Sequence, residues 1–245
     1  MSDSTRAMGS AVGGLPRRTL DQALRYDGVM RFLRRHGATR ILEVGSGASG
    51  LAAFWPGPVV GVDLRFDGTP FPNLTTVVGS ATELPFDDRA FDAVVCIDVF
   101  EHLPPEIRRP AFDEMLRVAD RCAWLAFPAG PAARRTDTRI AHLASRLGRD
   151  VPGWLQDHLQ LGYPEEAETL DWPVHGFARG IRRSLSVAAH FGVVLAEHAP
   201  GGHVVDRLGG HGWARSAILA TPGPRYRLEQ WFVRAGQHTA ADPLP

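Results

Sequence analysis

The chain has 245 residues, of which 44% are hydrophobic and 22% charged, a composition that suits one folded domain with a sizeable core. Its 27 basic and 27 acidic residues cancel, so the chain has no net attraction for polyphosphate, and we do not expect nucleic acid as a partner. The two cysteines, Cys96 and Cys122, stand in apolar runs, which argues against a disulfide framework. Residues 1–14 lack the apolar core of a signal peptide, and no apolar run is long enough to cross a bilayer. We therefore expect a cytoplasmic protein without a transmembrane segment.

The first half of the chain alternates strands with helices. Helical spacing of apolar residues predicts a helix over residues 20–36, ended by Gly37. Short apolar runs predict five strands, at residues 40–44, 58–63, 73–78, 91–97 and 123–127. A helix over residues 104–118 opens with two prolines, which the first helical turn tolerates. This alternation is typical of βαβ units and a parallel sheet.

Residues 130–180 break the alternation, because they are rich in Arg, His, Pro and Trp. Their short amphipathic pieces predict a helical insertion over the carboxyl edge of the sheet. A helix at residues 184–191, ended by Gly192, and a sixth strand at 193–197 are expected next. Residues 225–233 are the preferred seventh strand, and residues 213–220 are an alternative.

These elements predict a single domain over residues 1–245. Its core covers about residues 20–130 and 181–235, its helical cap about 131–180, and its flexible tails 1–15 and 236–245. The expected fold class is α/β, with a seven-stranded, mostly parallel sheet and a helical insertion after the fifth strand.

The chemistry-bearing signal is a glycine-rich loop directly after the first strand. Gly45, Gly47 and Gly50 form a G-x-G-x-x-G pattern, which lets the backbone turn sharply and approach a ligand. Asp63 follows eighteen residues after Gly45, at the end of the next strand, where a carboxylate can accept both hydroxyls of a ribose. A tight turn without a ligand and an ordinary solvated Asp are the alternatives. Together the two features favour an adenosine-containing ligand.

Glu43 distinguishes between adenosine-containing ligands. It stands two positions before the first glycine, where its charge would repel the pyrophosphate of a dinucleotide. S-adenosylmethionine has no phosphate and carries a sulfonium and an ammonium, which a carboxylate attracts. Glu43 therefore favours S-adenosylmethionine over a nicotinamide dinucleotide.

At this point the chain resembles the class I S-adenosylmethionine-dependent methyltransferases, whose sheet is Rossmann-like. The resemblance covers about residues 20–128 and rests on several segments in order: residues 41–50 (motif I), 62–64 (the acidic motif of the second strand), 79–92 (the adenine loop to the fourth strand), 95–104 (the motif after that strand) and 115–118. Several motifs at the expected spacing are more specific than the glycine loop alone.

The resemblance implies a set of cofactor-binding residues: Glu43, Gly45, Ser46 and Gly47 at the methionine portion, Asp63 at the ribose, Leu64, Ser80, Ala81 and Thr82 around the adenine, and a backbone carbonyl of Cys96 or Ile97 at the ammonium. One departure concerns Ser80, since many relatives have an Asp there that binds the adenine amino group. Adenine recognition is therefore expected to differ from that of these relatives.

His102 follows the fourth strand at the edge where ligands bind, and is the candidate general base. The alternative is a buried His that only supports the loop, a stretch it shares with Asp98 and Glu101. The insertion contributes His142, His158 and His175, whose scattered spacing is not that of a metal site, so we expect no metal.

Residues 97–100 lack the Asn/Asp-Pro-Pro-aromatic tetrad of enzymes that methylate planar amines. With the neutral charge, this predicts methyl transfer to a small-molecule, glycan or lipid-linked acceptor, with oxygen the favoured atom. A nicotinamide-dependent oxidoreductase and a non-catalytic S-adenosylmethionine-binding module are the alternatives.

Overall fold

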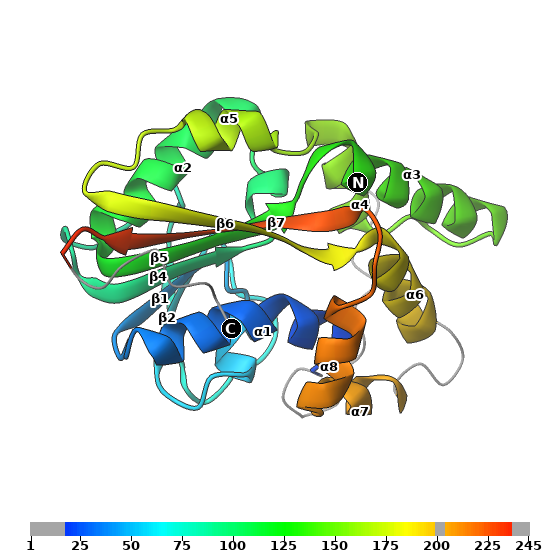
Figure 1. Ribbon diagram of the computed structural model, residues 1–245, viewed down its shortest axis with the longest axis horizontal. Helices are drawn as coiled ribbons and strands as arrows, with labels where there is room; N and C mark the ends of the chain where they lie inside the picture. Colours follow the sequence, from blue (N-terminus) through cyan, green and yellow to red (C-terminus); the bar gives the residue numbers. More distant parts are fainter. Residues whose placement is uncertain (1–17, 199–203, 237–245) are drawn as a thin grey trace.

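The computed structural model describes residues 18–198 and 204–236 and contains a seven-stranded sheet in the order β3-β2-β1-β4-β5-β7-β6 (Figure 1). The strands are β1 (Ile41–Val44), β2 (Val59–Asp63), β3 (Leu74–Val78), β4 (Phe91–Ile97), β5 (Ala119–Pro128), β6 (Phe177–Ser186) and β7 (Arg225–Arg234). The first five pair in parallel, while β7 runs antiparallel between β5 and β6. The seven-stranded, mostly parallel sheet predicted from the sequence is confirmed. The predicted tail at 1–15, and all of the tail at 236–245 except residue 236, lie outside the described residues.

The helices cover both faces of the sheet (Figure 1). They are α1 (Leu20–Arg35), α2 (Pro105–Val118), α3 (Gly130–Arg146), α4 (Gly153–Leu161), α5 (Glu166–Asp171), α6 (Val187–His198), α7 (Asp206–Gly209) and α8 (Gly212–Leu219), with short 3₁₀ turns η1 (Gly50–Ala53) and η2 (Phe100–His102). None of the helices in the described part of the chain is long and apolar enough to cross a lipid bilayer.

Two hydrophobic cores hold the sheet between its helices. On one face, α1 buries Val29 and Phe32 against the sheet, and its first turn is held by a capping box between Thr19 and Gln22. On the other face, α2 buries Phe112 and Met115. Every residue of β4 is buried, as expected of a central parallel strand.

The helical insertion is confirmed as α3, α4 and α5, and it ends before Phe177 instead of reaching residue 180. The predicted seventh strand at 225–233 is confirmed as β7, and the alternative at 213–220 is helix α8. Because β1 to β5 are parallel, their carboxyl ends lie at one edge of the sheet. Helices α3 and α4 adjoin this edge.

The predicted sixth strand was wrong. Residues 193–197 lie inside α6, as does Gly192, which therefore ends no helix; the sixth strand is β6, upstream at Phe177–Ser186. The physical reason is that β6 is an edge strand whose first residues are mostly half-buried or exposed, so it has no apolar run. The apolar run at residues 193–197 fits a packed helix as well as a strand.

Candidate functional site

The glycine loop joins β1 to η1, and its glycines meet two different requirements. Gly45 and Gly47 have φ angles of 76° and 52°, which favour glycine. A Cβ on Gly45 would lie 2.2 Å from Val99 in the loop after β4, whereas a Cβ on Gly47 would meet no atom within 4 Å. Gly45 therefore lets the loops after β1 and β4 pack together, and the backbone at Gly47 borders open space into which a ligand fits.

Glu43 lies beneath this loop, with 1% of its surface exposed. The Tyr26 hydroxyl donates to Glu43 Oε1 at 2.7 Å, and the Leu51 N–H donates to Oε2 at 2.6 Å. Burial raises the pKa of Glu43 to about 7, although these hydrogen bonds oppose the shift. The carboxylate therefore ties the glycine loop to α1. Its expected contact with a ligand ammonium stays a prediction.

Asp63 and Leu64 lie where β2 ends. The Gly47 N–H donates to Asp63 Oδ2 at 2.9 Å, and the Gly79 N–H donates to the Asp63 carbonyl at 3.0 Å. Leu64 follows with 72% of its surface exposed. A carboxylate and an exposed apolar side chain next to the glycine loop suit the ribose and the adenine of S-adenosylmethionine.

Ser80, Ala81 and Thr82 follow β3 in a short turn closed by a bridge between Ser80 and Glu83. The hydroxyls of Ser80 and Thr82 lie 2.8 Å apart, and Ser80 Oγ also accepts from the Thr82 N–H at 3.2 Å. Ala81 is half-buried against the core. The hydroxyl of Ser80 is therefore used within the turn, and an adenine contact from it stays a prediction.

Cys96 and Ile97 are buried at the end of β4, and burial raises the pKa of the Cys96 thiol. Asp98 follows with a φ of 56°, which is uncommon outside glycine. Burial alone would raise the pKa of Asp98, but ion pairs with Arg227 and Arg25 outweigh it and lower the value. The two arginines tie the loop after β4 to β7 and α1.

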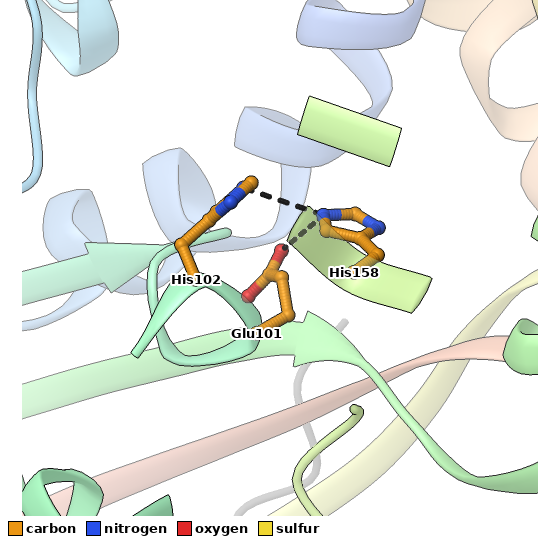
Figure 2. A group of neighbouring side chains, drawn as sticks. All are labelled: Glu101, His102 and His158. Atoms are coloured by element: carbon orange, nitrogen blue, oxygen red, sulfur yellow. Dashed lines mark hydrogen bonds and ion pairs between the residues drawn. The ribbon is translucent and has the colours of Figure 1, made fainter. Parts of the chain in front are cut away.

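Glu101 and His102 form the end of η2 and face His158 of α4 (Figure 2). His158 Nε2 lies 3.3 Å from His102 Nε2 and 3.8 Å from Glu101 Oε1. Burial and the neighbouring Asp98 raise the pKa of Glu101, while burial and His158 lower the pKa of His102. We call Glu101, His102 and His158 the polar triad.

The polar triad adjoins the glycine loop, because Val99 begins the turn that carries Glu101 and His102 and also packs on Gly45. His158 was not predicted to take part in a site, since it is 56 residues from His102. A hollow of about 270 Å³ lies elsewhere, among Arg89, Phe177 and Arg234 at the opposite edge of the sheet, and contains none of the predicted site residues.

The chain was compared with known proteins. Residues 42–127 match the family model of a methyltransferase domain. No curated protein matches the chain.

Several solved structures share the fold. One is a magnesium protoporphyrin IX methyltransferase from Synechocystis PCC 6803 with bound S-adenosylhomocysteine, 16% identical over 91% of this chain and 90% of that one, with a TM-score of 0.50. Another is a putative sarcosine dimethylglycine methyltransferase from Galdieria sulphuraria, 16% identical over 92% of both chains, with a TM-score of 0.52. The plantazolicin methyltransferase BamL, in complex with a substrate analogue and S-adenosylhomocysteine, is 12% identical over 86% of this chain and 85% of that one, with a TM-score of 0.53.

The matched residues run from β1 to β5 and include the glycine loop, Asp63 and the loop after β4. The open backbone at Gly47, the carboxylate of Asp63 and the exposed Leu64 suit an adenosine-containing ligand. Both S-adenosylmethionine and a nicotinamide dinucleotide contain adenosine, and the match to a methyltransferase domain favours S-adenosylmethionine. Residues 42–127 therefore match a methyltransferase domain, and the chain has the fold of the class I S-adenosylmethionine-dependent methyltransferases.

Proposed function

We propose that the chain transfers a methyl group from S-adenosylmethionine to a hydroxyl oxygen of a small-molecule, glycan or lipid-linked acceptor. The observation that carries this proposal is the position of the polar triad beside the glycine loop, across the contact between Val99 and Gly45. A hydroxyl must lose its proton to become a good nucleophile, and imidazole and carboxylate groups can accept or share that proton. An aliphatic amine needs less help from a proton acceptor to become a nucleophile. The tetrad that holds planar amines is absent at residues 97–100.

The cofactor, when bound, supplies a methyl group on a positively charged sulfur. We assign its binding to the residues predicted from the sequence. Gly45, Ser46 and Gly47 lie along the methionine portion, and Asp63 accepts from the ribose. Leu64, with the turn at residues 80–82, covers the adenine, and the end of β4 at residues 96–97 holds the ammonium. Since the sulfur is already electrophilic, the protein acts by aligning the acceptor and excluding water.

The cap formed by α3, α4 and α5 selects the acceptor in this proposal. Its helix α4 packs on η2, so it borders the polar triad. The core at residues 20–130 and 181–235 then holds the cofactor, and the cap at about 131–180 supplies specificity within one domain.

The experiment is incubation of the purified chain with methyl-deuterated S-adenosylmethionine and metabolite, glycan and lipid extracts, followed by mass spectrometry. A deuterated methyl ether or ester should form, and should be absent with Asp63→Ala. Label found only in amines would contradict oxygen methylation. Binding of S-adenosylhomocysteine without any labelled product would favour the non-catalytic binding module.

A further inference from the structure

The polar triad brings three metal-binding atom types together. One ligand atom from each of Glu101, His102 and His158 lies within 4.8 Å of the other two (Figure 2). Ligand atoms that share a metal ion at 2.0–2.2 Å are separated by about 3.0–3.6 Å. The distances of 3.3 Å and 3.8 Å from His158 Nε2 are therefore close to those of a formed site.

The carboxylates behind the two imidazoles fix which nitrogen carries the hydrogen. His158 Nδ1 lies 3.0 Å from Asp137 Oδ2, and His102 Nδ1 faces Asp157 Oδ2 at 3.5 Å. A carboxylate accepts, so the Nδ1 of each ring is placed to donate to it, and the Nε2 of each ring is then available as a ligand. A carboxylate behind a ligating imidazole is the usual arrangement in metal sites.

Asp137 is itself held in place. It is fully buried and accepts from the hydroxyls of Tyr163, at 2.6 Å, and Tyr226, at 2.9 Å. These two bonds come from the segment after α4 and from β7, so the orientation of His158 is fixed by packed elements.

Glu101 completes the group. Its side chain is fully buried, and neither carboxylate oxygen has a hydrogen-bond partner. A buried carboxylate without a donor is costly, and here its oxygen faces an imidazole lone pair. The carboxylate oxygen and the two ring nitrogens can all act as ligands, and a bound cation gives the Glu101 oxygen the partner that it lacks.

We propose that Glu101 Oε1, His102 Nε2 and His158 Nε2 bind one divalent transition-metal ion. Two imidazoles and one carboxylate favour ions such as Zn²⁺, Co²⁺, Fe²⁺ and Mn²⁺ over Mg²⁺ and Ca²⁺, which prefer oxygen ligands. The spacing of histidines along the sequence did not reveal this site, because α4 brings His158 to η2 only in the fold.

The site has a consequence that rests on the proposed function. Three protein ligands leave coordination positions for water or an acceptor oxygen. A hydroxyl on the ion has a lowered pKa and is a better nucleophile toward the cofactor methyl. His102 then serves as a metal ligand. The ion lowers the pKa of the hydroxyl, whose proton passes to solvent water as the oxygen takes the methyl group and S-adenosylhomocysteine leaves.

The test is titration of the full chain, stripped with a chelator, with Co²⁺ followed by visible absorption, and with Zn²⁺ by competition calorimetry. One equivalent should bind with micromolar or tighter affinity. Saturation should raise the melting temperature by about 5–10 °C. Glu101→Gln and His158→Gln should weaken binding by about 100-fold or more. His142→Gln, which removes an exposed histidine of α3, should bind like the parent.

The Glu101→Gln variant also separates metal binding from a structural role, because its amide can donate to His158. Without metal it should melt at or above the parent temperature. No binding of Co²⁺ or Zn²⁺, or equal binding by the Glu101→Gln and His142→Gln variants, would overturn the proposal. Methyl transfer to a hydroxyl that persists in chelator would support oxygen methylation and contradict a role of the metal in the transfer. Metal binding without transfer to a hydroxyl would support the metal site and contradict oxygen methylation.

Discussion

The backbone N–H of Gly47 donates to Asp63 Oδ2 at 2.9 Å, so one carboxylate links the glycine loop after β1 to the end of β2. The Gly79 N–H, which follows β3, donates to the carbonyl of the same residue. Asp63 thus joins the ends of three parallel strands. A ligand that spans these strand ends would contact loops that Asp63 already connects.

Replacement of Asp63 by Ala should weaken S-adenosylhomocysteine binding by about tenfold or more, since charge-assisted hydrogen bonds contribute roughly 1.5–3 kcal/mol. Asp63→Asn, which can still accept from Gly47, should lose less. Calorimetry measures both affinities, and thermal unfolding without ligand should show only the loss of the hydrogen bond from the Gly47 N–H. An affinity equal to that of the parent in Asp63→Ala would mean that the ribose is bound elsewhere.

The pKa of Glu43, raised to about 7 by burial, makes the stability of the fold depend on pH. The folded state holds a proton that the unfolded state releases near its ordinary value of 4.5. The stabilisation is complete below pH 4.5 and is lost as pH rises to about 7, a difference of about 3 kcal/mol. Urea unfolding at pH 4.5 and 8 should therefore show a larger loss for the parent than for Glu43→Gln. Equal losses in the two proteins would contradict the assignment.

Asp92 should stabilise the turn that leads into β1. It accepts from the backbone N–H of Thr39 at 3.0 Å and of Arg40 at 2.9 Å, and also pairs with the Arg40 guanidinium. Burial would raise the pKa of Asp92, but these donors outweigh it and lower the value, so the stabilisation is lost as pH falls below about 3.8. Asp92→Ala should cost about 2–4 kcal/mol in urea unfolding. Asp67→Ala, at an exposed ion pair with Arg65, should stay within about 0.5 kcal/mol of the parent and serves as the control.

His102→Gln tests whether the polar triad acts on the acceptor. Turnover with any methylated surrogate should fall by about 10²–10⁴-fold, the usual cost of losing a group that assists deprotonation, here as a ligand of the proposed ion. S-adenosylhomocysteine affinity should hardly change, because no predicted cofactor contact comes from this side chain. A combined loss of melting temperature and cofactor affinity would show that His102 only supports the loop after β4.

The strands β1 to β5 and the glycine loop could be predicted from the sequence because their signals are local. Central parallel strands such as β4 are apolar on both faces, and the glycine loop and Asp63 stand at the ends of such strands. The strand β6 could not be predicted, since most of the residues in the first part of this edge strand are half-buried or exposed and form no apolar run. The loop-organising bonds of Glu43 were also missed, because its partner Tyr26 lies on a separate helix.

The polar triad could be predicted from the sequence only in part. Glu101 and His102 are adjacent and follow a predicted strand, so their placement at the ligand edge was expected. His158 joins them only because α4 packs on η2, and its orientation depends on Asp137 of α3 and Tyr226 of β7. No spacing in the sequence encodes contacts that depend on how a cap folds back over the sheet.

Hydrogen exchange should separate the cap from the core. Among the residues of α4, only Leu155 and His158 are buried, whereas every residue of β4 is, so α4 should open at lower free energy than Phe91–Ile97. Because His158 ties α4 to the polar triad, a ligand that fills the site should slow exchange in α4. Mass spectrometry of peptides with and without S-adenosylhomocysteine and Zn²⁺ measures the change. Helix α8, whose main contacts are with α1, α7 and β6, is the internal control and should exchange equally in both states. Protection of α4 equal to that of β4, with no response to either ligand, would make the cap a structural extension of the core.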